Sequence, residues 1–317
     1  MPLDAIDNAI TPGDLYGLSD EPMYSGVLSF MRRKYTKDLT GVDVAVSGVP
    51  LDLMTTNRPG TRLGPAAIRK ASANLAWAPP WPWPFDPFER LAIIDYGDCI
   101  FDPGKPDTIT KDITDHARHI IENDVFMLTL GGDHYVTYPL LLAHAEKFGK
   151  LSLIHFDAHS DTWEEDEKRV DHGSMFYHAA IENLVDPLRS VQIGIRTTNE
   201  STHDFNILHA PVVMNSTAEE TANKIKSIVG DHPVYLTFDI DCLDPAHAPG
   251  TGTPVVGGLS SLKVLEILRQ MTGIRFVGMD VVEVSPPYDV SEITALAAAT
   301  IASEFLCLLA VDRKEIK

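Results

Sequence analysis

The sequence predicts one α/β domain with a mainly parallel sheet of about eight strands, covered by helices on both faces. Short, β-branched runs recur along the chain, and most are apolar nearly throughout, which is typical of strands buried on both faces of a parallel sheet. Segments with helical periodicity separate these runs, and neither repeats nor a clear linker divide the chain. A length of 317 residues is enough for one large core, although length alone would allow two domains.

In chain order, the predicted strands are 42–48, 91–95, 125–130, 151–156, 191–195, 212–214, 234–238 and 276–284. The predicted helices are 65–77, 110–123, 137–148, 218–229, 260–271 and a closing Ala- and Leu-rich helix from Ser291. Pro65 stands at the start of the first helix, a position that proline favours. We assign residues 41–317 to the domain, and residues 1–40 to an N-terminal extension that packs on the body or on a neighbouring subunit.

Residues 79–87 form a segment rich in proline and tryptophan that interrupts this pattern. Its five prolines exclude a helix and a central strand. We expect a rigid surface loop whose tryptophans pack on the body or on a neighbouring subunit. The alternative is an aromatic wall near a substrate entrance.

Composition excludes several classes of partner. The formal net charge of -19 argues against nucleic acid and anionic membranes, and favours cationic ligands. Three cysteines without CxxC spacing indicate neither a disulfide framework nor a zinc knuckle. Residues 1–14 show no secretory signal, and no uninterrupted apolar stretch approaches about 20 residues, so we expect a cytoplasmic protein without a membrane span.

Acidic and imidazole side chains gather in three short segments, each of which follows an apolar run. They are His134 in LGGDH, then Asp157, His159 and Asp161 in FDAHSD, then Asp239, Asp241 and Asp244 in FDIDCLD. Side chains two apart on a strand point the same way, so members of one segment can aim at one point. Ligands of open parallel sheets gather beyond the carboxyl ends of the strands, where all three segments fall, as does Glu283.

Several carboxylates that converge on one point repel each other and cannot all stay ionised without compensation. Two divalent cations would supply that compensation, so a binuclear metal centre is the simplest account of the pattern. Asp133 and Asp244 are better explained by a turn and a loop start. His155 has the same strand parity as Asp157, but one step deeper it fits a hydrogen-bonding role beneath the site.

These segments, together with PGTGTP at 249–254 and Gly257-Gly258, resemble the ureohydrolase superfamily of arginases and agmatinases. The similarity runs from about residue 43 to the C-terminus, and residues 74–77, 172–177 and 278–284 are most similar to bacterial agmatinases. The resemblance implies an arginase-like three-layer α/β/α sandwich, two Mn²⁺ ions and hydrolysis of a guanidino group. The favoured reaction is agmatine plus water to putrescine plus urea.

The family pattern implies the metal ligands. It assigns one ion to His134, Asp157, Asp161 and Asp239, and the other to Asp157, His159, Asp239 and Asp241. A set rich in oxygen, with two imidazoles and no thiolate, suits Mn²⁺, although Co²⁺ and Ni²⁺ also fit.

The same pattern implies the catalytic roles. A hydroxide bridging the two ions would attack the guanidinium carbon. Asp161 would pass a proton to the leaving amine, His172 would relay protons to or from solvent, and Glu283 would hold the guanidinium. His172 and Glu283 stand outside dense clusters, so a structural role is the alternative for these two.

The charged segment 162–171 separates Asp161 from His172, where this superfamily contacts the far end of its substrate. Glu164 and Glu165 suit the distal ammonium of agmatine, whereas Lys168 and Arg169 suit a carboxylate tail. A solvated loop is the simpler interpretation of such a charge run. This loop is also more charged than in the agmatinases that the chain resembles.

Other functions remain open from the sequence alone. A sister enzyme would act on 4-guanidinobutyrate or 3-guanidinopropionate. A non-catalytic subunit would be marked by a lost ligand, and none is missing. A deacetylase on the related fold would use one catalytic metal, against which the paired ligand set argues. The resemblance also implies a homo-oligomer, either a trimer or a hexamer.

Overall fold

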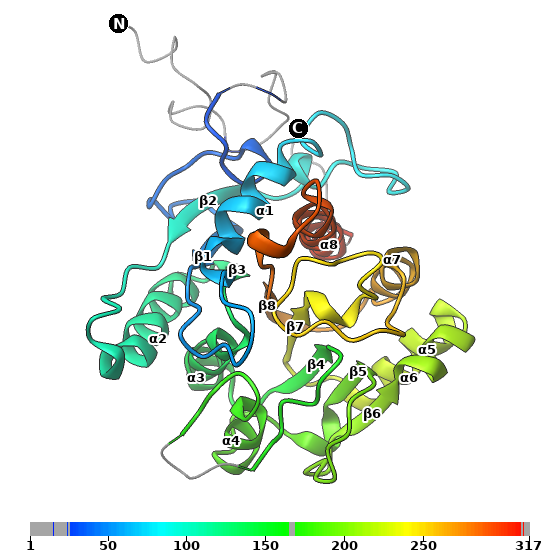
Figure 1. Ribbon diagram of the computed structural model, residues 1–317. Helices are drawn as coiled ribbons and strands as arrows, with labels where there is room; N and C mark the ends of the chain where they lie inside the picture. Colours follow the sequence, from blue (N-terminus) through cyan, green and yellow to red (C-terminus); the bar gives the residue numbers. More distant parts are fainter. Residues whose placement is uncertain (1–14, 16–23, 25, 165–168, 312, 314–317) are drawn as a thin grey trace, which may run out of the picture.

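The computed structural model describes residues 15, 24, 26–164, 169–311 and 313, and this part of the chain forms one eight-stranded sheet with eight α-helices (Figure 1). The strands are β1 (Val44–Val49), β2 (Ile93–Asp98), β3 (Phe126–Gly131), β4 (Ser152–Phe156), β5 (Val191–Ile195), β6 (Asn206–His209), β7 (Val234–Asp239) and β8 (Phe276–Val282). Their order in the sheet is β2-β1-β3-β8-β7-β4-β5-β6, and every neighbouring pair is parallel. The predicted fold class is confirmed.

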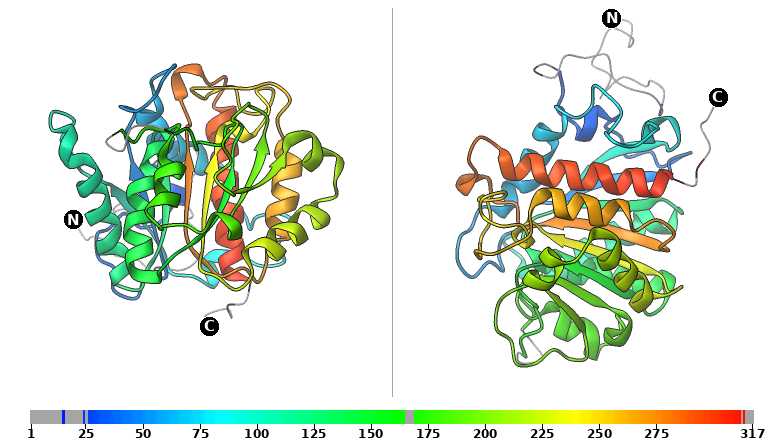
Figure 2. Two further views of the ribbon diagram at one scale, coloured as in Figure 1. Left: turned by 90° about the horizontal axis from the view of Figure 1, so that it is seen from below. Right: turned by 90° about the vertical axis from the view of Figure 1, so that its right-hand side faces the viewer.

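The helices form a layer on each face of the sheet, as the two views of Figure 2 show. They are α1 (Gly64–Ser72), α2 (Pro106–Glu122), α3 (Thr137–Phe148), α4 (Met175–Ile181), α5 (Ala210–Asn215), α6 (Ala218–Val229), α7 (Ser261–Arg269) and α8 (Ile293–Ala310). α2, α3 and α4 cover one face, and the other five helices cover the opposite face. The result is the three-layer sandwich that the resemblance implied.

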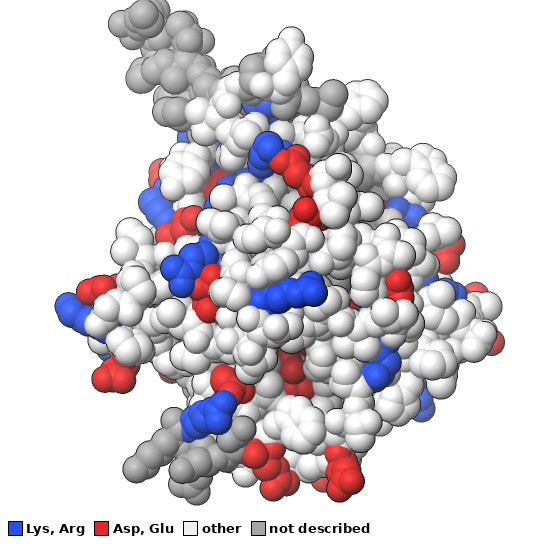
Figure 3. Space-filling view, in the orientation of Figure 1, with Lys and Arg blue, Asp and Glu red and all other residues white. Residues whose placement is uncertain are grey.

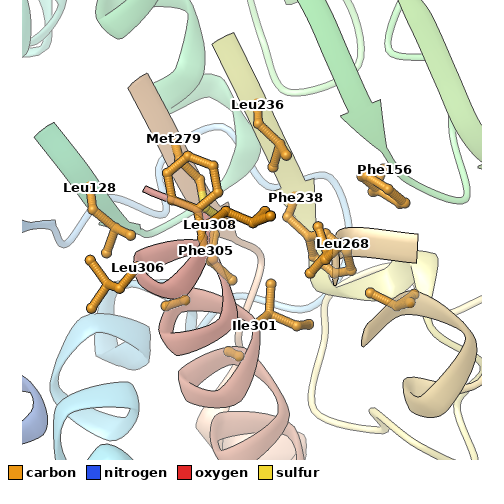
Figure 4. Close-up of a cluster of buried hydrophobic side chains, with 14 of the residues drawn as sticks. Leu128, Phe156, Leu236, Phe238, Leu268, Met279, Ile301, Phe305, Leu306 and Leu308 are labelled. Atoms are coloured by element: carbon orange, nitrogen blue, oxygen red, sulfur yellow. The ribbon is translucent and has the colours of Figure 1, made fainter. Parts of the chain in front are cut away.

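Alternating side chains of the strands divide the core into two parts, one on each side of the sheet. On β3, Leu128 belongs to the cluster on the α8 side and Met127 to the cluster on the α2 side. Figure 4 shows the first cluster, in which Leu128 and Met279 lie beside Phe305 of α8. α8 is long and apolar enough to cross a membrane by length and composition, but 72% of it is buried inside the protein, as expected for a core helix.

One strand prediction was wrong. Residues 212–214, predicted as a strand, lie in the short helix α5, which begins next to Pro211 and leaves Val212 and Met214 largely exposed. The strand at this edge is β6, which ends just before α5 and was missed because its side chains are only half-buried and do not form an apolar run. The short helix α4 was also missed.

The described part of the N-terminal extension packs on the body. The backbone N–H of Phe30 donates to Asp95 Oδ2 at 2.7 Å, and that of Met31 donates to Ser72 Oγ at 2.7 Å. Phe30 and Met31 are fully buried. Most of the extension, residues 1–14, 16–23 and 25, lies outside the described residues.

The loop of residues 79–87 lies against α7 and α8. The indole Nε1 of Trp83 donates to Glu304 Oε2 at 2.6 Å, and Arg269 donates to the carbonyl of Trp81 at 3.2 Å. Trp83 packs on the core, whereas Trp81 is 81% exposed. The expected packing of the loop on the body is therefore present for one tryptophan.

Candidate metal centre

The predicted ligands all lie at the carboxyl-terminal edge of the sheet, just beyond strands that are neighbours in space. His134 follows β3, Asp157 follows β4, and Asp239 is the last residue of β7. Because β3, β8, β7 and β4 are consecutive in the sheet, segments that are far apart in the sequence meet here. Figure 3 shows this face in space-filling form, with acidic atoms visible near its centre.

The first group of ligand atoms surrounds the imidazole of His134. Three carboxylate oxygens lie close to its Nδ1 atom: Asp157 Oδ2 at 3.1 Å, Asp161 Oδ2 at 3.0 Å and Asp239 Oδ2 at 3.2 Å. The Nδ1 atom is buried and has no hydrogen-bond partner of acceptable geometry among the described residues. These four atoms belong to the four residues that were predicted to hold one ion.

A chain of hydrogen bonds behind His134 decides which ring nitrogen carries the proton. The hydroxyl of Thr237 donates to Asp280 Oδ1 at 2.6 Å, so its oxygen is left to accept from His134 Nε2, which lies 2.8 Å away. With the proton on Nε2, the lone pair of Nδ1 faces the three carboxylates. Thr137 and Tyr235 donate to the other oxygen of Asp280, each at 2.9 Å, and hold it in place.

A second group of ligand atoms lies beside the first. The Nδ1 atom of His159 is 3.3 Å from Asp157 Oδ1 and 3.1 Å from Asp241 Oδ2. Asp157 thus turns one oxygen toward His134 and the other toward His159, an arrangement in which this carboxylate could bind two ions at once. Asp239 directs Oδ2 toward His134, while its Oδ1 accepts the backbone N–H of Asp241 at 2.8 Å. Its predicted bridging role remains a prediction.

The charge of this cluster fits two bound cations. Among the described residues, the ion-pair partners of Asp157, Asp161, Asp239 and Asp241 are all histidines. Burial, followed by the charges of Asp241 and Asp157, raises the pKa of Asp239 well above its usual value. Burial lowers the pKa of His134, but the three carboxylates outweigh burial and raise that pKa well above the usual value. One proton on Nδ1 cannot bond fully to three oxygens, whereas a cation between the four atoms satisfies all of them.

His155 also borders the first group, but its hydrogen bonds give it a different role. The amide Nε2 of Gln192 donates to the carbonyl of Ser160 at 2.6 Å, which fixes the orientation of the amide and directs the same nitrogen toward His155 Nδ1 at 3.2 Å. His155 Nδ1 therefore accepts, and its Nε2–H donates to Asp157 Oδ2 at 2.7 Å. A ring that donates to the predicted ligand Asp157 orients that carboxylate, which agrees with the role expected for His155.

The structure brings His172 and Glu283 together at the rim of the metal centre. Glu283 Oε1 accepts the backbone N–H of His134 at 2.8 Å and lies 3.2 Å from His172 Nδ1. The other oxygen, Oε2, is buried and has no hydrogen-bond partner in the described part of the chain. Glu283 and Asp161 both adopt left-handed backbone conformations, with φ of 62° and 49°. Such conformations cost about 1–3 kcal/mol each and are concentrated at functional sites.

A cavity of about 230 Å³ opens above these residues. It is lined by Thr56, His159, Asp161, Trp163, Arg169, Asp171, His172, Gly173, Asp239 and Thr253. Glu164 is absent from this lining and lies near Ser201 and His203, at 3.3 and 3.5 Å. The tail contact expected for Glu164 therefore remains a prediction, and Glu165 and Lys168 lie outside the described residues. No residue of the loop 79–87 lines the cavity, which argues against an aromatic wall formed by that loop.

Sequence reasoning missed several residues that shape the site. Arg196 donates to a series of backbone carbonyls in the segment that carries Asp241, including those of Asp241 at 2.6 Å and Val255 at 2.8 Å. Asp280, Thr237 and Thr56 were also missed. Arg196 follows β5 at the same sheet edge, and Asp280 is a charged residue within an apolar strand. Both features were visible signals in the sequence.

Comparison with known proteins gives concordant matches. The model of the Arginase family matches residues 42–308. An agmatinase from Chromobacterium violaceum is 59% identical over 305 residues, which cover 96% of this chain and 95% of the relative.

Solved structures agree with these matches. A structure described as a hypothetical agmatinase from Burkholderia thailandensis has a TM-score of 0.95 at 59% identity, covering 96% of this chain and 98% of that chain. Proclavaminate amidino hydrolase from Streptomyces clavuligerus has a TM-score of 0.86 at 38% identity, covering 92% and 99%.

Proposed function

The chain belongs to the arginase family and is an agmatinase-type ureohydrolase, and from this premise we propose that it converts agmatine and water into putrescine and urea with two manganese ions. The observation that carries the proposal is the buried Nδ1 atom of His134, which has no hydrogen-bond partner and faces three carboxylate oxygens. Carboxylates and imidazoles without thiolates suit Mn²⁺, with Co²⁺ and Ni²⁺ as alternatives. When bound, a pair of such ions supplies a water of lowered pKa as the nucleophile.

In this proposal Glu283 binds the guanidinium group of the substrate. Its Oε1 is occupied by the backbone N–H of His134 and by His172, whereas Oε2 lacks a partner. A buried carboxylate oxygen without a donor is costly, and a guanidinium N–H would satisfy it with a charge-assisted hydrogen bond. A Cβ on Gly252 would lie 3.2 Å from Oε2, so glycine keeps the approach to this oxygen open.

Proton transfer falls to Asp161 and His172. Asp161 lies in the first ligand group and also lines the cavity, so it can pass a proton to the departing amine. His172 lines the same cavity and contacts Glu283, so it can exchange protons between the site and solvent.

The tail of the substrate would extend past Trp163 toward Asp171. Trp163 is 53% exposed and is the aromatic residue of the cavity lining, and its indole suits both a methylene chain and an ammonium group. Asp171 Oδ2 lies 3.0 Å from the guanidinium of Arg169. Because this ion pair already engages Arg169, agmatine is favoured over 4-guanidinobutyrate and 3-guanidinopropionate, whose carboxylates would have to recruit Arg169 from Asp171.

Urea release by manganese-loaded protein tests the proposal, with agmatine, arginine, 4-guanidinobutyrate and 3-guanidinopropionate run in parallel. We expect a clear preference for agmatine. A preference for a carboxylate-tailed substrate would replace agmatine with a sister substrate and point to Arg169. Protein that binds metal but releases no urea from any of the four would contradict the proposed reaction.

We also propose that the protein is a cytoplasmic homo-oligomer, either a trimer or a hexamer, that binds neither nucleic acid nor membranes. Trp77, Trp81 and Leu262 line an apolar hollow beside α7 and α8, and each is more than half exposed. Exposed apolar surface of this kind is typical of subunit contacts. Light scattering coupled to size-exclusion chromatography measures the assembly directly, and a monomer at micromolar concentration would contradict it.

A further inference from the structure

The loop of residues 50–60, between β1 and α1, is tied to the metal-bearing edge of the sheet at several points. The carbonyl of Leu51 accepts the N–H of Asp133 at 2.8 Å, and a Cβ on Gly132 would collide with the backbone of Leu51. The N–H of Met54 donates to Asp133 Oδ2 at 2.9 Å. Beyond Thr56, the side-chain amide of Asn57 donates to the carbonyl of Gly252 at 3.2 Å. Thr56 is therefore held in place from both sides.

Thr56 contacts His172 through two different atoms. Its backbone N–H donates to His172 Nε2 at 3.2 Å, and its hydroxyl Oγ1 lies 3.0 Å from the same nitrogen. The opposite ring nitrogen, Nδ1, lies 3.2 Å from Glu283 Oε1. The ring is thus held between Glu283 on one side and Thr56 on the other, above the metal centre.

These two contacts suit the two forms of the ring. A neutral ring that donates from Nδ1 to Glu283 has a lone pair on Nε2, which accepts from the backbone N–H of Thr56. A protonated ring has a hydrogen on Nε2, which the backbone N–H cannot accept but the hydroxyl oxygen can. Thr56 therefore offers a partner to Nε2 in either form, without movement of the ring.

We propose that Thr56 is the positioning residue of His172, and that its hydroxyl supplies the hydrogen-bond acceptor that the ring needs while it carries a second proton. The proposal rests on the proposed function, in which His172 transfers protons. Thr56, which is neither a predicted metal ligand nor part of a strand end, would thus take part in proton transfer through His172.

The charged surroundings of His172 favour a ring that takes up a proton. Burial lowers the pKa of His172, but Glu283 outweighs burial, and Asp161 and Asp133 add to its effect, so the pKa is raised to about 9. Asp171, the preceding residue, directs its carboxylate to Gly173, Ser174 and Arg169. A proton on Nε2 therefore depends on Thr56 for a partner among the described contacts of this ring.

Three substitutions test the role of the hydroxyl. Thr56→Val keeps the backbone N–H and the branched shape but removes the acceptor, and Thr56→Ser restores it. Thr55→Val is the matched control, because the hydroxyl of Thr55 donates to Asp52 O at 3.1 Å in the same loop. In manganese-loaded enzyme, we expect Thr56→Val to move the alkaline limb of the pH profile of kcat down by about one pH unit, so that the loss of kcat approaches about tenfold at pH values above the limb. KM for agmatine should change by less than about twofold.

A second readout is independent of turnover. NMR titration of ¹⁵N-histidine in metal-free protein follows the ring itself, with the His172 signals identified by their loss in His172→Asn. Thr56→Val should lower the midpoint of that titration, whereas Thr56→Ser and Thr55→Val should leave it near the wild-type value. If Thr56→Val titrates like Thr55→Val, the proposal is wrong. An enzyme that releases no urea would instead contradict the proposed function, while the NMR result would still decide the contact between Thr56 and His172.

Discussion

Asp95 on β2 and Asp157 after β4 are both fully buried in the same protein, but their charges are compensated in different ways. Asp95 lies in an ion pair with Arg69, whose Nε and Nη2 atoms donate to its two oxygens at 2.8 and 3.1 Å. The backbone N–H groups of Phe30 and Gly97 complete its hydrogen bonds, at 2.7 and 2.9 Å. Every acceptor position of Asp95 therefore has a donor within the chain.

The carboxylates at the metal centre have no such closed arrangement. Asp157 shares its surroundings with Asp239 and Asp241, and two of its described imidazole partners, His134 and His159, themselves face further carboxylates. Burial of unbalanced charge is costly. A carboxylate with donors on every acceptor position, such as Asp95, is therefore structural, whereas the carboxylates around Asp157 need a bound cation to balance their charge. Substitutions can therefore disrupt one kind of site without the other.

The largest effect is expected from Asp239→Asn. Loss of this carboxylate removes a predicted ligand, and we expect kcat/KM for agmatine to fall by ~10⁴-fold, since metal assistance contributes several kcal/mol. In metal-free protein the same substitution should increase the free energy of unfolding, because it removes like-charge repulsion. Asp244→Asn is the control, since Asp244 accepts three backbone N–H groups and faces no imidazole in the cluster. Assays of urea release and metal analysis check the loss of activity, and unfolding in urea as denaturant checks the gain in stability of the metal-free protein. Unchanged metal content in Asp239→Asn would contradict the assignment of Asp239 as a ligand.

Arg69→Met tests the site around Asp95, whose acceptor positions all have donors within the chain. Removal of the guanidinium leaves Asp95 buried without its cation, and we expect a loss of about 3–5 kcal/mol in the free energy of unfolding. The specific activity of the folded fraction should be unchanged, because Arg69 does not line the cavity. Arg118→Met removes an exposed pair with Glu146 and should cost less than about 1 kcal/mol. Equal losses in the two variants would show that burial does not distinguish these pairs.

Asp280→Asn links the two kinds of site. Asp280 is a closed carboxylate, with donors from Thr237, Thr137 and Tyr235, but it acts on the metal centre by fixing the tautomer of His134. We expect a 10–100-fold weaker affinity for manganese, which is typical when a partner behind a metal ligand is lost. Tyr235→Phe removes one donor on the side away from Thr237 and should have a smaller effect. The manganese affinity of each variant is measured with a competing chelator. An affinity of Asp280→Asn equal to that of wild type would show that Asp280 does not act on the metal centre.

The smallest expected effect is on the pH dependence of stability, and it concerns the partly buried histidine His116, which is not part of the metal centre. His116 Nε2 lies 2.7 Å from Ser47 Oγ on β1, and burial, followed by the charges of Lys37 and His119, lowers its pKa to about 4. The unfolded chain binds this proton with the ordinary pKa of about 6.5, so the stabilisation is complete above pH 6.5 and is lost as pH falls toward 4. We expect acidification from pH 7 to pH 5 to destabilise wild type by about 2 kcal/mol more than His116→Gln. Urea unfolding at both pH values measures the difference, with the exposed His209→Gln as the control.

Much of the fold and of the candidate site could be predicted from local sequence. Strands buried on both faces are apolar throughout, so β1, β3, β7 and β8 were visible without the structure. The edge strand β6 carries no such signal, because its side chains are only half-buried or exposed, whereas the other edge strand, β2, is almost fully buried and was predicted. Spacing of two residues was enough to indicate that Asp157 and His159 act together.

The sequence by itself determined the α/β class through periodicity, the family through the resemblance of its motifs, and the residues able to hold metal through the charges of three short segments. Tertiary structure alone decided which atoms meet: Asp280 reaches His134 through Thr237, and Thr56 reaches His172 across 116 positions. It also placed Glu164 beside Ser201 and His203, although this residue lies only three positions after Asp161. Contacts between distant segments depend on strand order and loop paths, which local patterns do not specify.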